Sequence, residues 1–423
     1  MSLSDAMREK YQEPTKRQRF LAGLLRFTDK WLIGPFVRLV RDRLTARSTS
    51  ENSVVVTPRP ATELASVFRP SDNGGVYQRQ CPTVISGSAT WCDELARRAQ
   101  QPVTPLPFGT ADVEHAIVCG EGVIWKKTPS GIFAVEESLA TAISARSILP
   151  LTRTDDKILH VDPDLPLRKL SPKYSYALLR QPWDNNYGHW IVECLPKVAI
   201  LAEHYDITKL RFIVTRHSFL PPVRRMRQVC IDSLAAYGLR PDQIVWLGRE
   251  AVEVEHLLYA LPLTIHPWVK APRTVQILEE LGDKIAKGHQ GPRRIYSSRA
   301  SAGRRRLLNE SEILRVVRDF DVAIVDPGVM SFADQVRAFA HAELLIGNFG
   351  ANLTNAVFSP RGITMFVLAS QSMGDNFFWD LTNLKSGKYF CLHGAPTSSD
   401  PNSDFVIDPD EFRVFLKEQV LVP

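Results

Sequence analysis

The segment from Trp183 to Pro196 contains residues suited to acid–base chemistry. It reads Trp-Asp-Asn-Asn-Tyr-Gly-His-Trp-Ile-Val-Glu-Cys-Leu-Pro, which predicts a loop that enters a helix. His189 and Glu193 are four residues apart and therefore share one helical face. A carboxylate beside an imidazole orients the ring and raises its basicity, so the pair is a candidate general base with its supporting acid. The same spacing is also typical of a His–Glu pair that only stabilises a helix.

The loop Gly347-Asn-Phe-Gly350 is a candidate phosphate site. It follows a predicted strand at 343–346 and precedes a predicted short helix at 352–358. Glycines let the backbone turn tightly and approach a ligand closely. The unpaired N–H groups at a helix start carry partial positive charge and suit a phosphate or diphosphate. Two glycines can also serve the geometry of the turn alone, so both interpretations stay open.

A second loop is rich in arginine. Residues 297–306 read Ser-Ser-Arg-Ala-Ser-Ala-Gly-Arg-Arg-Arg and follow a predicted strand at 293–297. If this strand is parallel to the one at 343–346, both loops lie at the same edge of the sheet. Guanidinium forks match phosphate oxygens bidentately, although some of the four arginines are expected to be only solvated. Asn309 fits a helix N-cap better than a ligand contact.

No metal-dependent or nucleotide-triphosphate motif stands out. His-x-x-x-Glu supplies two metal ligands without a third nearby. The Asp-x-Asp pairs at 162–164 and 408–410 each contain proline and are interpreted as turns. Neither a G-x-x-x-x-G-K-[ST] loop nor a G-x-S-x-G elbow occurs in the sequence. We therefore expect no metal site.

The C-terminal part alternates between strands and helices. Strands are predicted at 293–297, 322–325, 343–346 and 363–368, with capped helices opening at Asn309 and at Ser331. Short loops between alternating elements predict a parallel, doubly wound sheet. Such sheets bind ligands at the carboxyl ends of their strands, where both candidate loops lie.

The rest of the chain is also of the α/β type. Strands are predicted at 116–119, 131–135, 176–179, 212–214 and 244–247, and helices at 190–205 and 222–238. The length of 423 residues suits two domains rather than one core. The expected division is a basic arm at 1–47, a linker at 48–60, an N-terminal domain at 61–265, a C-terminal domain at 266–395, and a tail at 396–423 that could pack back on the first domain.

The net positive charge of the chain comes from the arm. Residues 1–47 contain 11 Lys or Arg and 5 Asp or Glu, a net of +6, which equals the charge of the whole chain. The remaining chain is neutral, which disfavours a nucleic-acid-binding surface. Residues 16–44 are aromatic, basic and amphipathic but too interrupted to span a membrane. They could lie on an anionic membrane surface, or pack against the protein.

The six cysteines indicate a reduced compartment. None of them forms a short C-x-x-C pair of the zinc or redox type. A cytoplasmic protein is the simplest interpretation.

Three stretches together resemble glycosyltransferase family 61, a group with bacterial capsule and lipopolysaccharide enzymes and with eukaryotic protein- and xylan-modifying members. Their order and spacing agree with the family over about 185 residues, from 180 to 365. They are Asn186-Tyr-Gly-His-Trp190 with Glu193 and Leu195-Pro-Lys197; Arg294-Ile-Tyr-Ser-Ser-Arg299 with Arg305-Arg306 and Asn309-Glu310; and Ser331-Phe-Ala-Asp-Gln335 with Gly347-Asn-Phe-Gly-Ala-Asn-Leu-Thr-Asn355, Phe358 and Pro360-Arg-Gly362.

The resemblance implies a GT-B architecture, in which two Rossmann-like domains face each other across a cleft. It also implies an inverting, metal-independent transfer from a nucleotide sugar, with no further cofactor. The donor would bind the C-terminal domain and the acceptor mainly the N-terminal domain. The implied donor-binding residues are Arg299, Arg305, Asn309, Gly347, Asn348, Phe349, Gly350, Asn352, Leu353, Thr354 and Asn355.

On the acceptor side, the resemblance implies that the acceptor lies beside His189, and our hypothesis is that His189 is the base and that Glu193 supports it. Asp184 is a second candidate, since a carboxylate in the adjacent loop could do the same work. The residues expected beside the acceptor are Asn186, Tyr187 and Trp190.

The expected protein is a hexosyl- or pentosyltransferase of bacterial surface polysaccharide synthesis, which glycosylates a glycan or a lipid-linked glycan. It would be cytoplasmic and peripheral at the inner face of the cell membrane. The family usually has His where this chain has Phe349, Gly at Asn352, and Glu in the strand position that matches Val367. These departures motivate an alternative, a catalytically degenerate subunit that acts as a membrane-associated binding partner.

Overall fold

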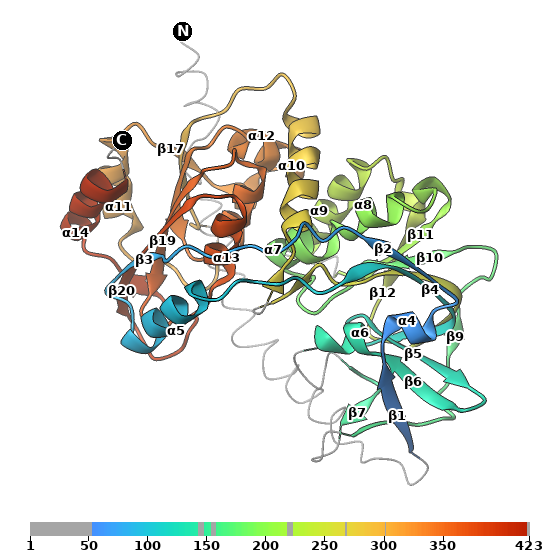
Figure 1. The fold of residues 1–423 in the computed structure, drawn as a ribbon. Coiled ribbons are helices and arrows are strands. Elements are labelled where there is room, and N and C mark those ends of the chain that lie inside the picture. Colours follow the sequence, from blue (N-terminus) through green and yellow to red (C-terminus); the bar gives the residue numbers. More distant parts are fainter. Residues whose placement is uncertain are drawn as a thin grey trace. The chain divides into compact units, whose positions relative to one another are not determined.

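The computed structural model describes residues 53–142, 148–153, 158–217, 223–266, 269–300 and 302–420. It is a mixed α/β protein with several sheets and with helices between the strands (Figure 1). Its described residues divide into two compact units: an N-terminal unit of residues 53–75 and 104–277, and a C-terminal unit of residues 76–103 and 278–420. The predicted basic arm lies outside the described residues. None of the helices in the described part is long and apolar enough to cross a membrane.

One large mixed sheet forms the centre of the N-terminal unit. Beside the main path of this sheet, β2 (Val67–Ser71) pairs with β4 (Phe108–Cys119), and β9 (Arg168–Lys169) pairs with β13 (Val252–Ala260). The main path runs in the order β12 (Ile244–Leu247), β11 (Arg211–Thr215), β10 (Tyr176–Leu178), β13 (Val252–Ala260), β4 (Phe108–Cys119), β5 (Val123–Thr128), β6 (Gly131–Val135), β1 (Val54–Arg59), β8 (Leu159–Val161) and β7 (Thr152–Arg153).

The pairing within this sheet changes along its width. Strands β10, β11, β12 and β13 pair in parallel, whereas β13, β4, β5 and β6 pair antiparallel. The predicted strands of this region are confirmed. The expectation of a linker at 48–60 is wrong for its described part, because the β-branched run Val54-Val-Val-Thr57 forms β1 and pairs with β6 and β8.

Helices and a small hairpin complete the N-terminal unit. The predicted helices at 190–205 and 222–238 are confirmed, although the first begins with a π-helical turn. The elements are α4 (Ala61–Leu64), α6 (Glu136–Ala140), α7 (Tyr187–His189), the π-helix η2 (Trp190–Cys194), α8 (Lys197–Ala202), η3 (Ile207–Lys209), α9 (Val223–Ala235), η4 (Pro241–Gln243) and the hairpin of β14 (Thr264–Ile265) and β15 (Val269–Lys270).

The C-terminal unit contains the predicted parallel sheet. The order of its strands is β17 (Ala323–Val325), β16 (Arg294–Ser297), β18 (Leu344–Asn348), β19 (Thr364–Ser370), β20 (Lys388–Pro396) and β21 (Phe405–Val406), with β3 (Thr83–Ile85) beside β20. The boundary between the two units falls inside helix α10 (Pro272–Ala286), after Ile277. The remaining helices are α5 (Ala89–Ala99), α11 (Glu310–Arg318), η5 (Pro327–Val329), α12 (Phe332–Phe339), η6 (Ala351–Phe358), α13 (Phe377–Leu384), α14 (Pro409–Phe415) and η7 (Leu416–Val420).

The register of this sheet brings the two candidate loops together. All pairs from β17 to β20 are parallel, and Ser297 at the end of β16 lies opposite Gly347 in β18. Continuous apolar runs such as Leu344-Leu-Ile346 are buried, as expected of a parallel strand covered on both faces. The prediction that the loops after these two strands share one sheet edge is confirmed.

One of the two predicted helix caps is confirmed and the other is wrong. The Ser331 hydroxyl accepts a hydrogen bond from the Asp334 N–H at 3.1 Å and caps α12. Asn309 stands at the start of α11, but its side chain makes no capping bond. Its amide instead donates to the Ile407 carbonyl at 2.7 Å, because the chain near β21 runs beside it.

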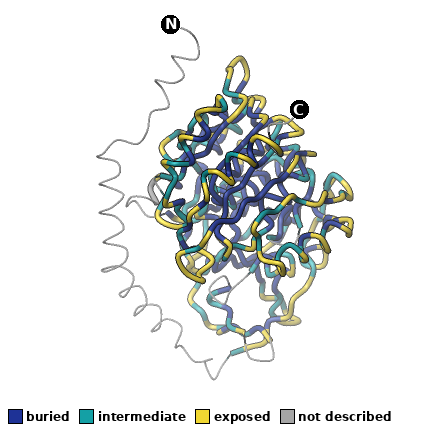
Figure 2. Tube along the Cα trace, turned by 90° about the vertical axis from the view of Figure 1, so that its left-hand side faces the viewer, coloured by how far each residue is buried: buried dark blue, intermediate teal, exposed yellow. Residues whose placement is uncertain are grey.

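In the C-terminal unit, a core cluster on one face of the sheet includes residues of the last helices. Figure 2 shows the central strands as buried chain, with exposure concentrated in the peripheral loops. Phe366 of β19 stacks on Phe412 of α14 with ring centroids 5.4 Å apart. Helix α14 also contacts α11, so the segment after residue 396 packs within this unit.

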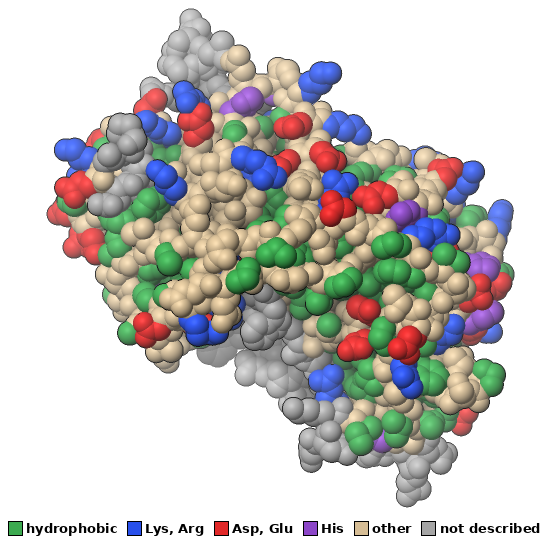
Figure 3. Space-filling view, in the orientation of Figure 1, with side chains coloured by type: hydrophobic (Ala, Val, Ile, Leu, Met, Phe, Trp, Pro, Cys, Tyr) green, Lys and Arg blue, Asp and Glu red, His purple; other side chains and the backbone are tan. Residues whose placement is uncertain are grey.

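Charges of both signs are mixed on the surface. Figure 3 shows Lys and Arg side chains interspersed with Asp and Glu on the face in view. Exposed ion pairs occur on the surface, for example Arg293 with Glu343 and Arg216 with Glu250. This surface agrees with the neutral charge of residues 48–423.

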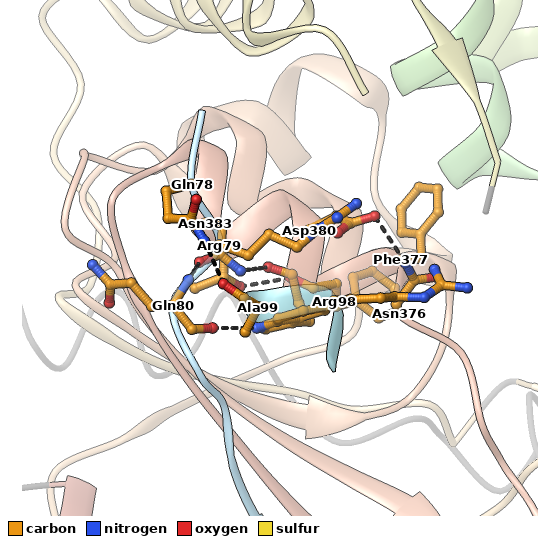
Figure 4. A network of polar contacts seen from close by, with 12 residues as sticks. Gln78, Arg79, Gln80, Arg98, Ala99, Asn376, Phe377, Asp380 and Asn383 are labelled. Atoms are coloured by element: carbon orange, nitrogen blue, oxygen red, sulfur yellow. Dashed lines mark hydrogen bonds and ion pairs between the residues drawn. The ribbon is translucent and has the colours of Figure 1, made fainter. Parts of the chain in front are cut away.

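A buried polar network ties residues 76–103 to the C-terminal unit (Figure 4). Arg79 Nε donates to Asp380 Oδ1 at 2.6 Å, and both side chains are almost fully buried. The Arg79 guanidinium also lies over the Trp379 ring, and the indole N–H of Trp379 donates to the Gln80 carbonyl at 2.8 Å. This network explains why a segment early in the sequence belongs to the later unit.

We expect Arg79→Ala to lower the free energy of unfolding by about 3–5 kcal/mol, because it leaves the Asp380 carboxylate buried without its counter-ion. Urea denaturation followed by tryptophan fluorescence measures the loss. The matched control is Arg97→Ala, whose exposed pair with Glu94 contributes at most about 1 kcal/mol. Equal losses in the two variants would contradict the structural role of the buried pair.

Candidate functional site

The helix that carries His189 starts from a capped loop. The Asn186 side chain accepts a hydrogen bond from the Gly188 N–H at 2.9 Å and begins α7. The next turn is π-helical, with the Leu195 N–H donating to the Trp190 carbonyl at 2.9 Å. Single π-helical turns of this kind are frequent at functional sites.

The predicted His189–Glu193 contact is confirmed. Nδ1 of His189 lies 2.9 Å from Oε1 of Glu193. The carboxylate is buried, whereas the imidazole side chain keeps 17% of its exposure. A carboxylate that accepts the Nδ1 hydrogen leaves Nε2 as the basic nitrogen, so the pair can take up a proton at Nε2.

Asp184 lies in a different, buried environment. Its carboxylate accepts a hydrogen bond from the Thr215 hydroxyl at 2.6 Å, and Arg180 Nε donates to the same hydroxyl at 2.9 Å. Burial raises the pKa of Asp184 to about 6, although the nearby Arg180 charge acts in the opposite direction. The fully buried Lys197 donates to the Arg180 carbonyl at 3.3 Å and extends this network.

The residues expected beside the acceptor have different surroundings. Asn186 uses its side chain as the helix cap described above. Tyr187 is half-buried, and burial raises the pKa of its phenol. Trp190 is fully buried and donates its indole N–H to the Ser233 hydroxyl at 2.9 Å. An acceptor role therefore does not suit Trp190, which holds the helix against the core.

Two rings that sequence reasoning missed lie beside His189. The Trp183 ring is 5.0 Å from the His189 ring between centroids and 6.1 Å from the ring of His266. The two imidazoles are 5.7 Å apart. His266 comes from the β14–β15 hairpin, far along the chain, and no sequence pattern pointed to it. Trp183 belongs to the loop that the sequence predicts before the helix, and its position in the sequence indicates no separate role.

In the C-terminal unit, Gly347 and Gly350 are required by close approaches. A Cβ at Gly347 would lie 2.8 Å from the Ser297 carbonyl oxygen. A Cβ at Gly350 would lie 1.5 Å from Nη1 of Arg299. The Arg299 guanidinium therefore packs directly on the backbone of the glycine loop.

Arg305 reaches the same place from the other end of its loop. Its guanidinium lies 5.7 Å from the centre of the Phe349 ring. Burial lowers the pKa of Arg299 to about 10, and the Arg305 charge adds to this shift. Burial also lowers the pKa of Arg305. Two cations share a partly desolvated site, an arrangement that favours a bound anion.

The other two arginines of the loop play different parts. Arg304 is exposed. Arg306 forms an ion pair and hydrogen bonds with Asp404. The prediction that only some of the four serve a ligand remains open, and Arg299 and Arg305 are the pair that the structure brings together.

The predicted residues around the glycine loop are largely buried. By the geometry of a 3₁₀-helix, the first N–H groups of η6 have no partner inside the helix. Asn309 is used by Ile407, as described above. Three asparagines of this segment make side-chain contacts: Asn348 Oδ1 with the Tyr296 hydroxyl at 3.5 Å, Asn352 Nδ2 with the Ser298 carbonyl at 3.0 Å, and Asn355 Nδ2 with Gln335 Oε1 at 3.1 Å. Leu353 and Thr354 are both fully buried.

Glu310 forms hydrogen bonds with the start of the arginine loop. Its carboxylate accepts hydrogen bonds from the Tyr296 hydroxyl at 3.2 Å and from the Ser298 hydroxyl at 3.1 Å. Burial raises the pKa of Glu310. Within the described ranges, no group of three or more His, Cys, Asp or Glu side chains is arranged to hold a metal ion.

Comparison with known proteins gives a family match over part of the chain. Residues 187–366, less than half of the chain, match the family model described as Glycosyltransferase 61. The matched range includes the His189–Glu193 pair, the arginine loop and the glycine loop, and it ends just before Val367. No curated protein matches the sequence. Over this range the chain is similar to glycosyltransferase family 61, and this similarity is the support for a glycosyltransferase function.

Proposed function

We propose that this chain is an inverting, metal-independent glycosyltransferase that uses a nucleotide-diphosphate sugar as donor. The observation that carries the proposal is the convergence of Arg299 and Arg305 on the glycine loop at the carboxyl ends of β16 and β18. A diphosphate would offset two partly desolvated positive charges and could accept hydrogen bonds from the start of η6. The two arginines would then take the place of a divalent metal ion in offsetting the negative charge of the diphosphate.

The proposed reaction is an in-line displacement at the anomeric carbon. An acceptor oxygen forms the new bond to this carbon while the bond to the donor phosphate oxygen breaks. The acceptor proton passes to Nε2 of His189, whose Nδ1 is held by Glu193. The nucleoside diphosphate leaves with the electron pair, and Arg299 and Arg305 stabilise its charge.

The proposal includes a GT-B arrangement, in which the N-terminal unit binds the acceptor and the C-terminal unit binds the donor. The acceptor would be a glycan or lipid-linked glycan of bacterial surface polysaccharide synthesis. This finer assignment rests on the resemblance to capsule and lipopolysaccharide enzymes.

We expect Arg299→Ala to weaken the binding of nucleoside diphosphates by about 1.5–3 kcal/mol, the value of a hydrogen bond to a charged group. Isothermal titration with a panel of nucleoside diphosphates measures the effect, with and without a chelator. The control is Arg304→Ala, which changes an exposed arginine of the same loop. Equal affinity in both variants would contradict the donor site, and binding lost in chelator would contradict metal independence.

We expect His189→Ala to reduce turnover by about 10²–10⁴-fold, the usual contribution of a general base. The affinity for nucleoside diphosphate should stay nearly unchanged, because His189 belongs to the other unit. Glu193→Gln should lose less, since it only orients the imidazole. A transfer assay with a nucleotide-sugar panel tests this. Wild-type protein that binds nucleotide but transfers no sugar would favour the degenerate binding subunit.

Asp184→Asn is the control for the competing base. The raised pKa means that the folded protein binds this proton more tightly, so the contribution of Asp184 to stability is present below pH about 4 and is lost as pH rises through about 6. Relative to the wild type, the unfolding free energy of Asp184→Asn should therefore rise by about 3 kcal/mol from about pH 4 to about pH 7.

Turnover abolished in Asp184→Asn and retained in His189→Ala would identify Asp184 as the base.

The proposal also assigns membrane attachment to residues 16–44, which lie outside the described residues. Each basic residue of such a segment contributes about 1 kcal/mol near an anionic surface. Full-length protein should float with phosphatidylglycerol vesicles but not with phosphatidylcholine vesicles, and deletion of residues 1–47 should release it. Full-length protein that stays at the bottom with both vesicles would refute attachment at the inner membrane face.

A further inference from the structure

Trp183 occupies a backbone position that normally favours glycine. The Asp184 N–H donates to the Gln181 carbonyl at 3.2 Å, which closes a four-residue turn. Pro182 is the second residue of this turn, and Trp183, the third, has a φ of 65°. Proline restricts φ to negative values, so the turn is of type II, whose third position favours Gly or Asn. A bulky residue in this conformation is strained.

The residues on either side of Trp183 are fixed by buried contacts. The Gln181 side-chain amide donates to the Thr264 carbonyl at 3.0 Å. The Asp184 carboxylate accepts from the Thr215 hydroxyl at 2.6 Å. The indole between them is 43% exposed, so its burial offsets little of the backbone strain. Strain that packing does not offset is typical of functional positions.

The exposed indole has two imidazoles as neighbours. The planes of Trp183 and His189 are tilted by 47°, and the ring of His266 meets that of Trp183 at 64°. The contact between Gln181 and Thr264 joins the Trp183 turn to the hairpin that carries His266. The cluster thus combines a large apolar ring face with polar ring nitrogens.

We propose that Trp183 is the platform on which the acceptor sugar binds. A pyranose has an apolar face of C–H groups and a rim of hydroxyls, which matches an indole face bordered by imidazoles. Packed on Trp183, the ring presents a hydroxyl toward His189, and His266 contacts another. This inference rests on the proposed function, because it takes His189 as the base, and it defines the acceptor as a pyranose unit of a glycan.

The test measures binding of the labelled full-length protein to an array of immobilised pyranose oligosaccharides. Trp183→Ala should lower the affinity for the glycans bound by wild type by at least about tenfold, and Trp183→Phe should retain part of it. The control is Leu106→Ala, which removes another exposed apolar side chain of the same unit. Trp183→Gly suits the positive φ, so its melting temperature should equal or exceed that of wild type while its glycan binding is lost.

The kinetic readout is separate from the binding readout. In Trp183→Ala the KM for the acceptor should rise, while the Kd for nucleoside diphosphate stays unchanged. Wild type that binds no saccharide, equal glycan affinity in Trp183→Gly, or an unchanged acceptor KM would each overturn the inference. Glycan binding that depends on Trp183 in a protein without sugar transfer would support the platform and refute the transferase.

Discussion

The contact between the Arg299 guanidinium and the Gly350 backbone is the constraint on which the candidate phosphate site depends. Any side chain at position 350 would place its Cβ 2.2 Å from Cζ of Arg299 and would expel the guanidinium. Gly347 meets a similar limit at the Ser297 carbonyl, which it faces across the β16–β18 pair. Gly350 therefore allows the two loops to make contact, and Gly347 allows the close approach of β18 to Ser297 of β16. The result is a pair of arginines whose mutual repulsion a bound anion would relieve.

In the N-terminal unit, the carboxylates of Glu193 and Asp184 differ in the groups that contact them. Glu193 is held at the Nδ1 of a partly exposed imidazole, where it can stabilise a positive charge on the ring. Asp184 is held by Thr215 and by the Arg180 charge in the interior, where burial favours its neutral form. Asp184 also flanks the Trp183 turn, so the same buried network that withdraws this carboxylate from solvent fixes the exposed indole. This division of roles could not be deduced from spacing, because both carboxylates lie within a few residues of His189.

The sequence predicted the elements that depend on local patterns and short loops. The apolar runs of β16, β17, β18 and β19 and the cap at Ser331 lie where periodicity indicated, and so do the two loops at one sheet edge. It did not predict that residues 76–103 join the C-terminal unit, because that depends on the distant contact of Arg79 with Asp380. The Asn309 cap failed for a similar reason, since the chain at Ile407 competes for its side chain. The ring cluster was missed because His266 reaches His189 only through the fold of the β14–β15 hairpin.

The contacts of Phe349 indicate what its departure from the family pattern changes in the site. The phenyl ring packs edge-on against Phe378, with centroids 4.9 Å apart, and lies beneath the Arg305 guanidinium. A cation over an aromatic face gains about 0.5–1 kcal/mol when exposed and more when desolvated, which helps to hold Arg305 in its positive-φ conformation. An imidazole at this position would add a hydrogen-bonding group, but in its protonated form it would also add a third positive charge beside Arg299 and Arg305. Phe349 therefore lacks the hydrogen-bonding group of an imidazole but contacts Arg305, so this departure alone does not contradict the proposed diphosphate site.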